Sequence, residues 1–380
     1  MEEAQTQPIA VRRLVSEGRG PLVVKIGSSL LIDDHGRPRS AWMNALAARL
    51  SQRPGPVLVV SSGAIGLGRE ALGLAARPGS LSEAQAAAAV GQIRLAQAWA
   101  EVWAKQNRTA AQLLLTLADL EDRGRYLNAR NTVETLLGQR IVPIINENDT
   151  VATGEIRFGD NDRLAARVAL LADAELLLLL SDVDGLYRTD PRLDADAERI
   201  AQVPRIDAEI EALAGSAQST GFGTGGMVSK ITAARIAVDG GCPVLLAGGT
   251  GNGDPIDTIE RGGGTHFHAT ERPLARRKHW LRSLQRPVGT IHIDAGAAAA
   301  LKQGASLLAT GVVRIDGEFD RGAPVSIDGP HGPLGLGLAG YDSREATVVS
   351  GHHSRRFEEL LGYAGRGAVV HRDDLVLFER

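Results

Sequence analysis

The sequence predicts an α/β protein in three layers, with helices on both faces of a mainly parallel sheet, followed by a small β-rich barrel domain. Up to about residue 270, short apolar runs rich in β-branched residues alternate with segments of helical periodicity. Beyond about residue 275 the pattern changes to short strands separated by turns. We therefore expect a flexible lead over 1–18, a first domain over 19–272, a linker over 273–286 and a second domain over 287–380.

Composition excludes several classes of protein. A net charge of −3 over 380 residues gives no electrostatic reason to expect nucleic acid or an anionic membrane as partner. The single cysteine, Cys242, rules out an internal disulfide and a cysteine-based zinc site, and its place at the start of an apolar strand predicts burial. No apolar run reaches membrane-spanning length, and the N-terminus lacks the apolar region of a signal peptide. We expect a cytoplasmic protein.

The first domain should contain six strands with helices between them. The run ELLLLL is the most continuous and predicts a central parallel strand. Ser80 and Glu83 have the spacing of a capping box at the start of a long alanine-rich helix. The strands are expected at 22–26, 57–60, 111–116, 141–145, 175–180 and 243–247, and helices at 40–52, 82–106 and 121–138 among others.

The glycine-rich stretch TGFGTGGMVSK, residues 220–230, leads directly into a helical pattern and ends in Lys230. Glycines allow close approach of the backbone to a ligand, and a helix start presents unpaired N–H groups and partial positive charge. With the lysine, these features suit a polyphosphate. The alternative is an ordinary flexible loop before a helix, and the P-loop pattern is absent.

Lys25 lies inside the apolar run LVVKI, where a lysine is costly to bury without an anion. The alternative is an edge strand with this lysine in solvent. The next run leads into SSGAIGLGRE, where Ser62 and nearby backbone N–H groups could bind a small anion, although glycines at such junctions often serve packing alone.

Two polar clusters follow strands, NENDT at 146–150 and SDVDG at 181–185, and a further cluster, GDND at 159–162, precedes a helix. Turn formation explains part of the first cluster, and Asp160, Asn161 or Asp162 could simply cap the helix that follows. In open α/β sheets, however, ligands bind outside the carboxyl ends of the strands. If these ends converge, one cleft carries two lysines, several carboxylates and two glycine loops.

The motifs VVKIGSS, VVSSGAIGLGRE, INENDTVA, FGDND, LYRTDPR and GTGGMVSKITAA, in this order, resemble the glutamate 5-kinases of the amino-acid kinase superfamily. The resemblance runs from about residue 20 to the C-terminus. The last part, with GHHS and VVHRDDLV, looks like the PUA domain often attached to these enzymes. It implies the amino-acid kinase fold for the first domain.

The resemblance also assigns site residues. Lys25 and Lys230 match the two lysines that bind phosphates and stabilise the transferring group, and Asp162 matches the aspartate that orients them. Ser181 stands where many relatives have threonine, but the hydroxyl is kept. The glutamate-binding positions match Ser62, Asp149 and Asn161. The nucleotide-binding positions match Lys25, Ser181, Asp182, Thr224, Gly225, Gly226, Met227, Val228, Ser229 and Lys230.

The reaction implied by the resemblance uses ATP and Mg²⁺ to form glutamyl 5-phosphate, the first step towards proline. The resemblance assigns no residue to the metal. It further implies a homo-oligomer, dimer or tetramer, that proline inhibits, and suggests hand-over of the product to glutamate-5-semialdehyde dehydrogenase. The chemistry of the residues agrees, because a substrate carboxylate is already ionised at pH 7 and needs no general base.

Two alternatives stay open at this point. Another kinase of the same fold could act on acetylglutamate, aspartate, carbamate or a nucleoside monophosphate, although the acidic and amide-rich clusters favour an acceptor with an ammonium group. An RNA-binding protein is the other alternative, since PUA domains commonly bind RNA. From residue 281 onward, lysine and arginine are balanced by acidic residues, so we do not expect RNA.

Overall fold

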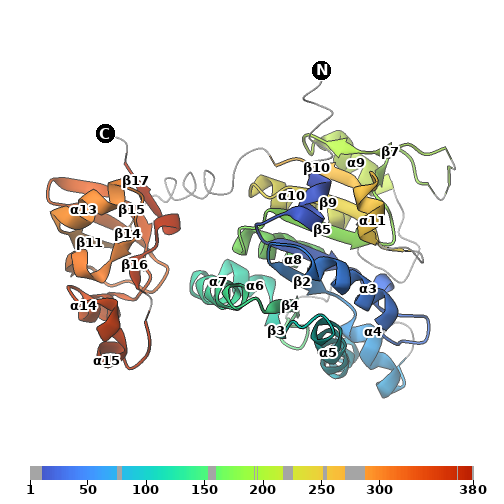
Figure 1. Cartoon of the computed structure of the whole chain (residues 1–380), viewed down its shortest axis with the longest axis horizontal. Coiled ribbons are helices and arrows are strands. Elements are labelled where there is room, and N and C mark those ends of the chain that lie inside the picture. The colour runs from blue at the N-terminus through green and yellow to red at the C-terminus, as the bar shows by residue number, and fades with distance from the viewer. Residues whose placement is uncertain are drawn as a thin grey trace. The chain divides into compact units, whose positions relative to one another are not determined.

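The structure is a computed structural model. It describes residues 11–74, 79–152, 160–191, 193–194, 196–216, 226–250, 255–269, 287–365 and 367–378. The chain forms two compact units that divide near residue 271 (Figure 1). The linker expected over 273–286 falls outside the described residues.

The first unit is built on an eight-stranded sheet with the strand order β3-β4-β2-β1-β5-β9-β10-β8. The first six strands in this order run parallel, which confirms the mainly parallel sheet, and β10 runs antiparallel to β9. The strands are β1 Leu22–Ile26, β2 Val57–Ser61, β3 Ala110–Leu115, β4 Val142–Glu147, β5 Leu176–Ser181, β8 Gln202–Val203, β9 Val244–Gly248 and β10 Thr265–Phe267, with a separate hairpin of β6 Leu186–Tyr187 and β7 Arg199–Ile200.

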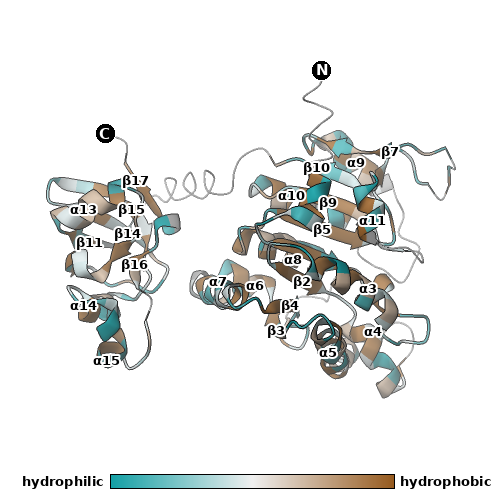
Figure 2. Ribbon diagram, in the orientation of Figure 1, coloured by the Kyte–Doolittle hydropathy of each residue, from teal (hydrophilic) through white to brown (hydrophobic). Residues whose placement is uncertain are grey.

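Helices cover both faces of this sheet. The helices α3, α5 and α11 contribute to the core on one face, and α8 packs on the other face beside α10. Figure 2 shows these helices as mixtures of hydrophobic and hydrophilic residues, as expected for helices that bury one side. Their bounds are α2 Ser28–Leu31, α3 Ser40–Ser51, α4 Ala64–Arg69, α5 Leu81–Ala104, α6 Leu117–Glu121, α7 Arg123–Gly138, α8 Asp160–Leu171, α9 Ala208–Ser216, α10 Met227–Asp239 and α11 Pro255–Glu260.

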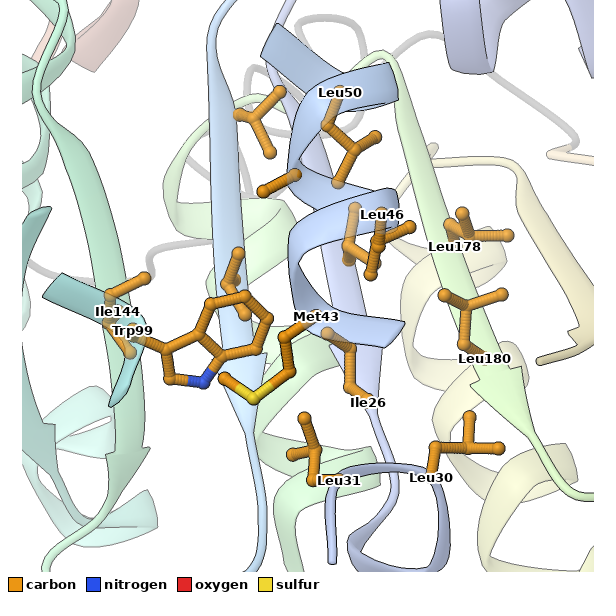
Figure 3. Packing of buried hydrophobic residues seen from close by; sticks show 14 of the residues in the cluster. Ile26, Leu30, Leu31, Met43, Leu46, Leu50, Trp99, Ile144, Leu178 and Leu180 are labelled. Carbon is orange, nitrogen blue, oxygen red and sulfur yellow. The ribbon is translucent and has the colours of Figure 1, made fainter. Parts of the chain in front are cut away.

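The core between α3 and the strands is close-packed and apolar. Met43 and Leu46 of α3 lie against Ile26 of β1, and Trp99 of α5 reaches the same cluster (Figure 3). Burial of each such side chain contributes roughly 1.5–3 kcal/mol. The buried indole N–H of Trp99 is satisfied, because it donates to Ser61 Oγ at 2.9 Å. Within the described ranges, no helix has both the length and the apolar character needed to cross a membrane.

One expectation about local structure needs correction, and another is confirmed. The flexible lead expected over 1–18 was wrong for residues 11–17, which form a helix whose Val15 is 1% exposed in the core. The helix expected over 121–138 is confirmed as α7, and a separate short helix, α6, precedes it. Asp122 accepts from the backbone N–H of Arg125, and α7 starts at Arg123.

The second unit has its own sheet and its own core, which confirms a separate β-rich domain. Five strands pair in the order β13-β11-β14-β15-β17, and β12 pairs with β16. Their side chains enclose a core of Ile291, Val325, Ile327 and Tyr341 among others. The elements are β11 Gly289–Ile293, α13 Ala295–Lys302, β12 Leu307–Leu308, β13 Val312–Asp316, β14 Pro324–Gly329, β15 Gly332–Leu338, α14 Ser343–Val349, α15 Phe357–Leu361, β16 Ala368–Val370 and β17 Leu375–Leu377.

Candidate active site

The carboxyl ends of the parallel strands meet at one edge of the first sheet. Ile26 at the end of β1 pairs with Ser61 of β2, and Ser181 of β5 pairs with Gly248 of β9. The polar residues that follow these strands therefore lie along the same edge. The helices α8 and α10 begin there, so their first turns direct partial positive charge to this edge.

Lys25 is a buried cation on a central strand. It is 6% exposed, and β1 lies between β2 and β5, so the edge-strand alternative is wrong. Its Nζ lies 2.5 Å from Oδ1 of Asp162, in the first turn of α8. The Nζ of Lys230, in the first turn of α10, lies 3.9 Å from the other oxygen of the same carboxylate. Two buried ammonium groups thus converge on one buried carboxylate.

The surroundings keep Asp162 ionised. Burial by itself would raise the pKa of this carboxyl, but Lys25, Lys230 and the hydroxyl of Ser229 outweigh burial and hold the pKa below its ordinary value. Burial lowers the pKa of Lys230, and Lys25 adds to this, while Asp162 and Asp182 oppose it. A positive site of this kind favours an anionic ligand that lies against both lysines.

Ser229 joins α10 to this group. Its Oγ donates to Asp162 Oδ2 at 2.7 Å and also contacts the carbonyl of Gly226 at 2.9 Å. The start of α10 is therefore tied to the start of α8 through one carboxylate. The helix-capping alternative for Asp162 is not supported, because both of its oxygens face the lysines and Ser229.

A second group of polar side chains lies next to the strand β4. Asn161 Nδ2 donates to Ser62 Oγ and to Asn146 Oδ1, both at 3.0 Å. The backbone N–H of Glu147 donates to Asn146 Oδ1 at 2.9 Å and to Asn161 Oδ1 at 3.3 Å. Asn146 Nδ2 donates in turn to Gln92 Oε1 at 2.7 Å. This arrangement is a fixed set of amides and one hydroxyl beside the charged group.

The other residues expected at the site are placed as follows. Ser181 is buried and its hydroxyl donates to Asp182, which is exposed. Val228 is 56% exposed in the first turn of α10. Asp149 is half-buried in the turn after β4. Gly226 and Met227 open α10, whereas Thr224 and Gly225 fall outside the described residues.

The network contains a residue that our reading of the sequence missed. Gln92 lies on the stripe of α5 that buries Ala88, Leu95 and Trp99, at spacings of four, three and four residues. A polar residue on an otherwise apolar stripe is a signal that could have identified it. Asn146 was noted only as a member of the NENDT cluster, and the structure shows it at the centre of the amide group.

The two helices beside this network touch through their backbones. A Cβ on Gly91 of α5 would lie 1.8 Å from the carbonyl oxygen of Ala64, and a Cβ on Gly68 of α4 would lie 1.9 Å from that of Ala87. No side chain fits at either position, so α4 and α5 pack at a separation that only glycine permits. Ser62, just before α4, and Gln92 on α5 are thereby held in register.

Comparison with known proteins identifies the family. The model of the amino acid kinase family matches residues 20–248, and that of the PUA domain matches residues 289–361. A glutamate 5-kinase of Cereibacter sphaeroides is 52% identical over 361 residues, covering 94% of this chain and 96% of the relative. The chain belongs to the glutamate 5-kinases of the amino acid kinase family.

Further relatives carry the same name. A glutamate 5-kinase of Nitrobacter winogradskyi is 52% identical over 362 residues, which cover 94% of this chain and 95% of the relative. One of Agrobacterium fabrum is 49% identical over 361 residues, which cover 94% and 92%. The resemblance seen in the sequence motifs is thus confirmed over nearly the full length of both chains.

Proposed function

We propose that the chain transfers the γ-phosphoryl group of ATP to the side-chain carboxylate of L-glutamate. The product is L-glutamyl 5-phosphate, and the reaction is the first step of proline biosynthesis. The observation that carries this proposal is the buried group of Lys25, Asp162 and Lys230 at the carboxyl edge of the sheet. The names of the full-length relatives support the choice of acceptor.

The site suits phosphoryl transfer to a carboxylate. The acceptor carboxylate, with an ordinary pKa of about 4.3, is ionised at pH 7 and can attack without a general base. Transfer spreads negative charge over the moving phosphoryl group, which fixed cations stabilise. Lys25 and Lys230 supply two such cations, and Asp162 holds both ammonium groups in place. The first turns of α8 and α10 add N–H groups for phosphate oxygens.

The acceptor would lie against the amide network. We assign Ser62 and Asn161 to the polar groups of glutamate, and Asp149 to its ammonium group. Ser181, Asp182 and residues 224–230 are assigned to the nucleotide. These roles follow from the match to the family motifs, and the hydrogen bond between Ser62 and Asn161 supports the pairing of those two residues.

Mg²⁺ fits this site as a companion of the nucleotide. Among the described residues, no three metal-binding side chains are close enough to hold an ion. Asp162 is already engaged by the lysines and Ser229. The metal would therefore be held chiefly by phosphate oxygens and water, as is common for Mg²⁺. When bound, it neutralises charge on the phosphates.

A hydroxamate assay with a panel of acceptors tests the proposal. Hydroxylamine traps an acyl phosphate, and the panel is L-glutamate, N-acetylglutamate and L-aspartate, each with ATP and Mg²⁺. We expect product with L-glutamate at a kcat/KM far above the others. Preference for another acceptor would assign the chain to a different carboxylate kinase, and absence of product with all three would overturn the proposal.

Several properties remain predictions. We propose that the protein acts in the cytoplasm as a homo-oligomer, that proline inhibits it, and that the product passes to glutamate-5-semialdehyde dehydrogenase. We also propose that residues 19–272 form the kinase domain and 287–380 the PUA domain. Size-exclusion chromatography with light scattering would test the oligomer, and assays with added proline would test the inhibition.

A further inference from the structure

Gln92 closes a ring of contacts around the acceptor side of the site. Its Oε1 accepts from Asn146 Nδ2 at 2.7 Å, and the ring continues through Asn161 to Ser62. Ser62 stands directly before α4, and α4 packs through its glycine contact on α5, which carries Gln92. The ring therefore connects two packed helices with the ends of β2 and β4.

A backbone group fixes the direction of every hydrogen bond in this ring. The N–H of Glu147 can only donate, and it donates to the side-chain oxygens of both Asn146 and Asn161. The amide nitrogen of Asn146 must then face Gln92, so Gln92 must present its oxygen. In the same way the nitrogen of Asn161 must face Ser62, so Ser62 Oγ accepts that bond.

This direction matters for binding an anionic group. Because Ser62 Oγ is the acceptor in its bond with Asn161, its own proton is left to donate to a ligand oxygen. A carboxylate accepts such hydrogen bonds and cannot donate any when ionised. The ring thus presents the hydroxyl of Ser62 in the orientation that a substrate carboxylate requires.

We infer that Gln92 is a positioning residue for the acceptor, acting through Asn146 and Asn161 on Ser62. The inference rests on the proposed function and extends it to a residue outside the expected binding positions. The Nε2 of Gln92 is buried and has no hydrogen-bond partner among the described residues. An unsatisfied buried donor is unfavourable for folding, so a contribution to stability does not explain why an amide stands at position 92. The Oε1 of the same side chain, in contrast, completes the ring.

The test compares two substitutions at this position with a control on the same helix. Gln92→Met keeps the length of the side chain but removes the oxygen that accepts from Asn146. We expect KM for the acceptor to rise about tenfold, the value of one lost hydrogen bond, while KM for ATP stays within twofold. The control is Gln97→Met, because Gln97 is exposed on α5 and, among the described residues, its side chain bonds to Glu101 of the same helix.

Gln92→Glu should restore the function that Gln92→Met loses. Burial favours the neutral form of a carboxyl group, and both its neutral and its ionised form present an oxygen to Asn146. We expect KM for the acceptor within about threefold of the parent. A residue that only filled space would show the opposite order, since methionine is the better apolar substitute.

A double substitution identifies the route of the effect. In an Asn146→Ala background, Gln92→Met should add less than a twofold change in KM, because residues of one network are not additive. Full additivity would show that Gln92 acts by another route and would overturn the inference.

The assays use the acceptor from the panel that the parent protein prefers, at saturating ATP, and thermal melting confirms that each variant is folded. An unchanged acceptor KM for Gln92→Met, or an equal rise in the KM for ATP, would overturn the positioning role. If the parent protein prefers another acceptor, the proposed function is contradicted. The inference about Gln92 is still tested in that case, because its effect is measured with the preferred acceptor.

Discussion

Buried cations lie at both the amino and the carboxyl ends of the strands of the first sheet, but the groups that surround these cations differ. At the amino edge, the side chain of Arg53 is fully buried and donates to the carbonyls of Leu14, Gly20 and Pro56 and to Glu175. At the carboxyl edge, Lys25 and Lys230 converge on the single carboxylate of Asp162.

The difference separates a structural cation from a functional one. The guanidinium of Arg53 distributes its donors over four acceptors supplied by the protein, which joins the N-terminal helix to the starts of the strands. The lysines at the other edge are compact point charges on flexible stems, with helix N-termini beside them, which suits an incoming phosphate. Removing Arg53 should therefore lower the free energy of unfolding, and removing one of the two lysines should lower turnover.

The largest expected effect is that of Arg53→Met on stability. The substitution removes four hydrogen bonds, three to carbonyls and one to Glu175, whose side chain is 31% exposed, and at roughly 1 kcal/mol for each bond the loss is about 3–5 kcal/mol. Urea denaturation should show this loss in the free energy of unfolding, while kcat of the folded protein stays within about threefold of the parent, because Arg53 lies at the opposite edge from the site. The matched control, Arg49→Met, breaks partly exposed ion pairs with Asp257 and Glu260 and should cost less than about 1 kcal/mol. An Arg53→Met protein that is as stable as the parent but has lost its activity would contradict the structural role of Arg53.

Lys230→Ala should show the opposite behaviour. Loss of one fixed cation that stabilises the transferring phosphoryl group costs on the order of a hundred- to a thousandfold in kcat. The circular dichroism spectrum and the melting temperature should stay close to those of the parent. Lys105→Ala, at the exposed end of α5, serves as the control. Near-normal turnover of a folded Lys230→Ala protein would remove this lysine from the mechanism.

Asp149→Ala should affect one substrate more than the other. If its carboxylate pairs with the ammonium of glutamate, KM for glutamate should rise on the order of ten- to a hundredfold, the value of a hydrogen bond to a charged group. KM for ATP should change little. Asp149→Asn keeps the shape of the side chain and removes the charge, so an equal effect of both variants points to the charge. Unchanged constants in both variants would mean that residues 146–150 form only a turn.

The smallest effect is expected from removing the second unit. The two units have separate cores, and all the proposed site residues lie in the first. A chain ending at residue 272 should therefore still form acyl phosphate, with kcat within about threefold of the parent. A soluble, monodisperse truncated protein that forms no hydroxamate would show that the second unit supports the site.

Much of the fold and of the site was predictable because the signals are local. The apolar run that contains Lys25 predicts a buried strand, and the glycine loop before Lys230 predicts the start of a helix. The structure places both lysines at the edge where the strand ends meet. The order of motifs along the chain was sufficient to identify the family.

The remainder depends on contacts between distant parts of the chain. Arg53 donates to the carbonyls of Leu14 and Gly20 and to the carboxylate of Glu175, all distant in sequence, so no local pattern distinguishes it from an exposed arginine. Gln92 precedes Asn146 by 54 residues, and only the packing of α5 on the sheet brings them together. The reversed strand β10 was not predicted, since the direction of a three-residue strand has no sequence signal of its own.

The glycine contact between α4 and α5 has a consequence for motion and for mutation. Two helices whose backbones touch have no side chains between them that could rearrange, so α4 and α5 should move as one rigid body. A bulky residue at either glycine would force the helices apart and displace Ser62 from Gln92. In a library of every single substitution, positions 68 and 91 should therefore be as intolerant as the charged positions of the site, although neither has a side chain to offer a ligand.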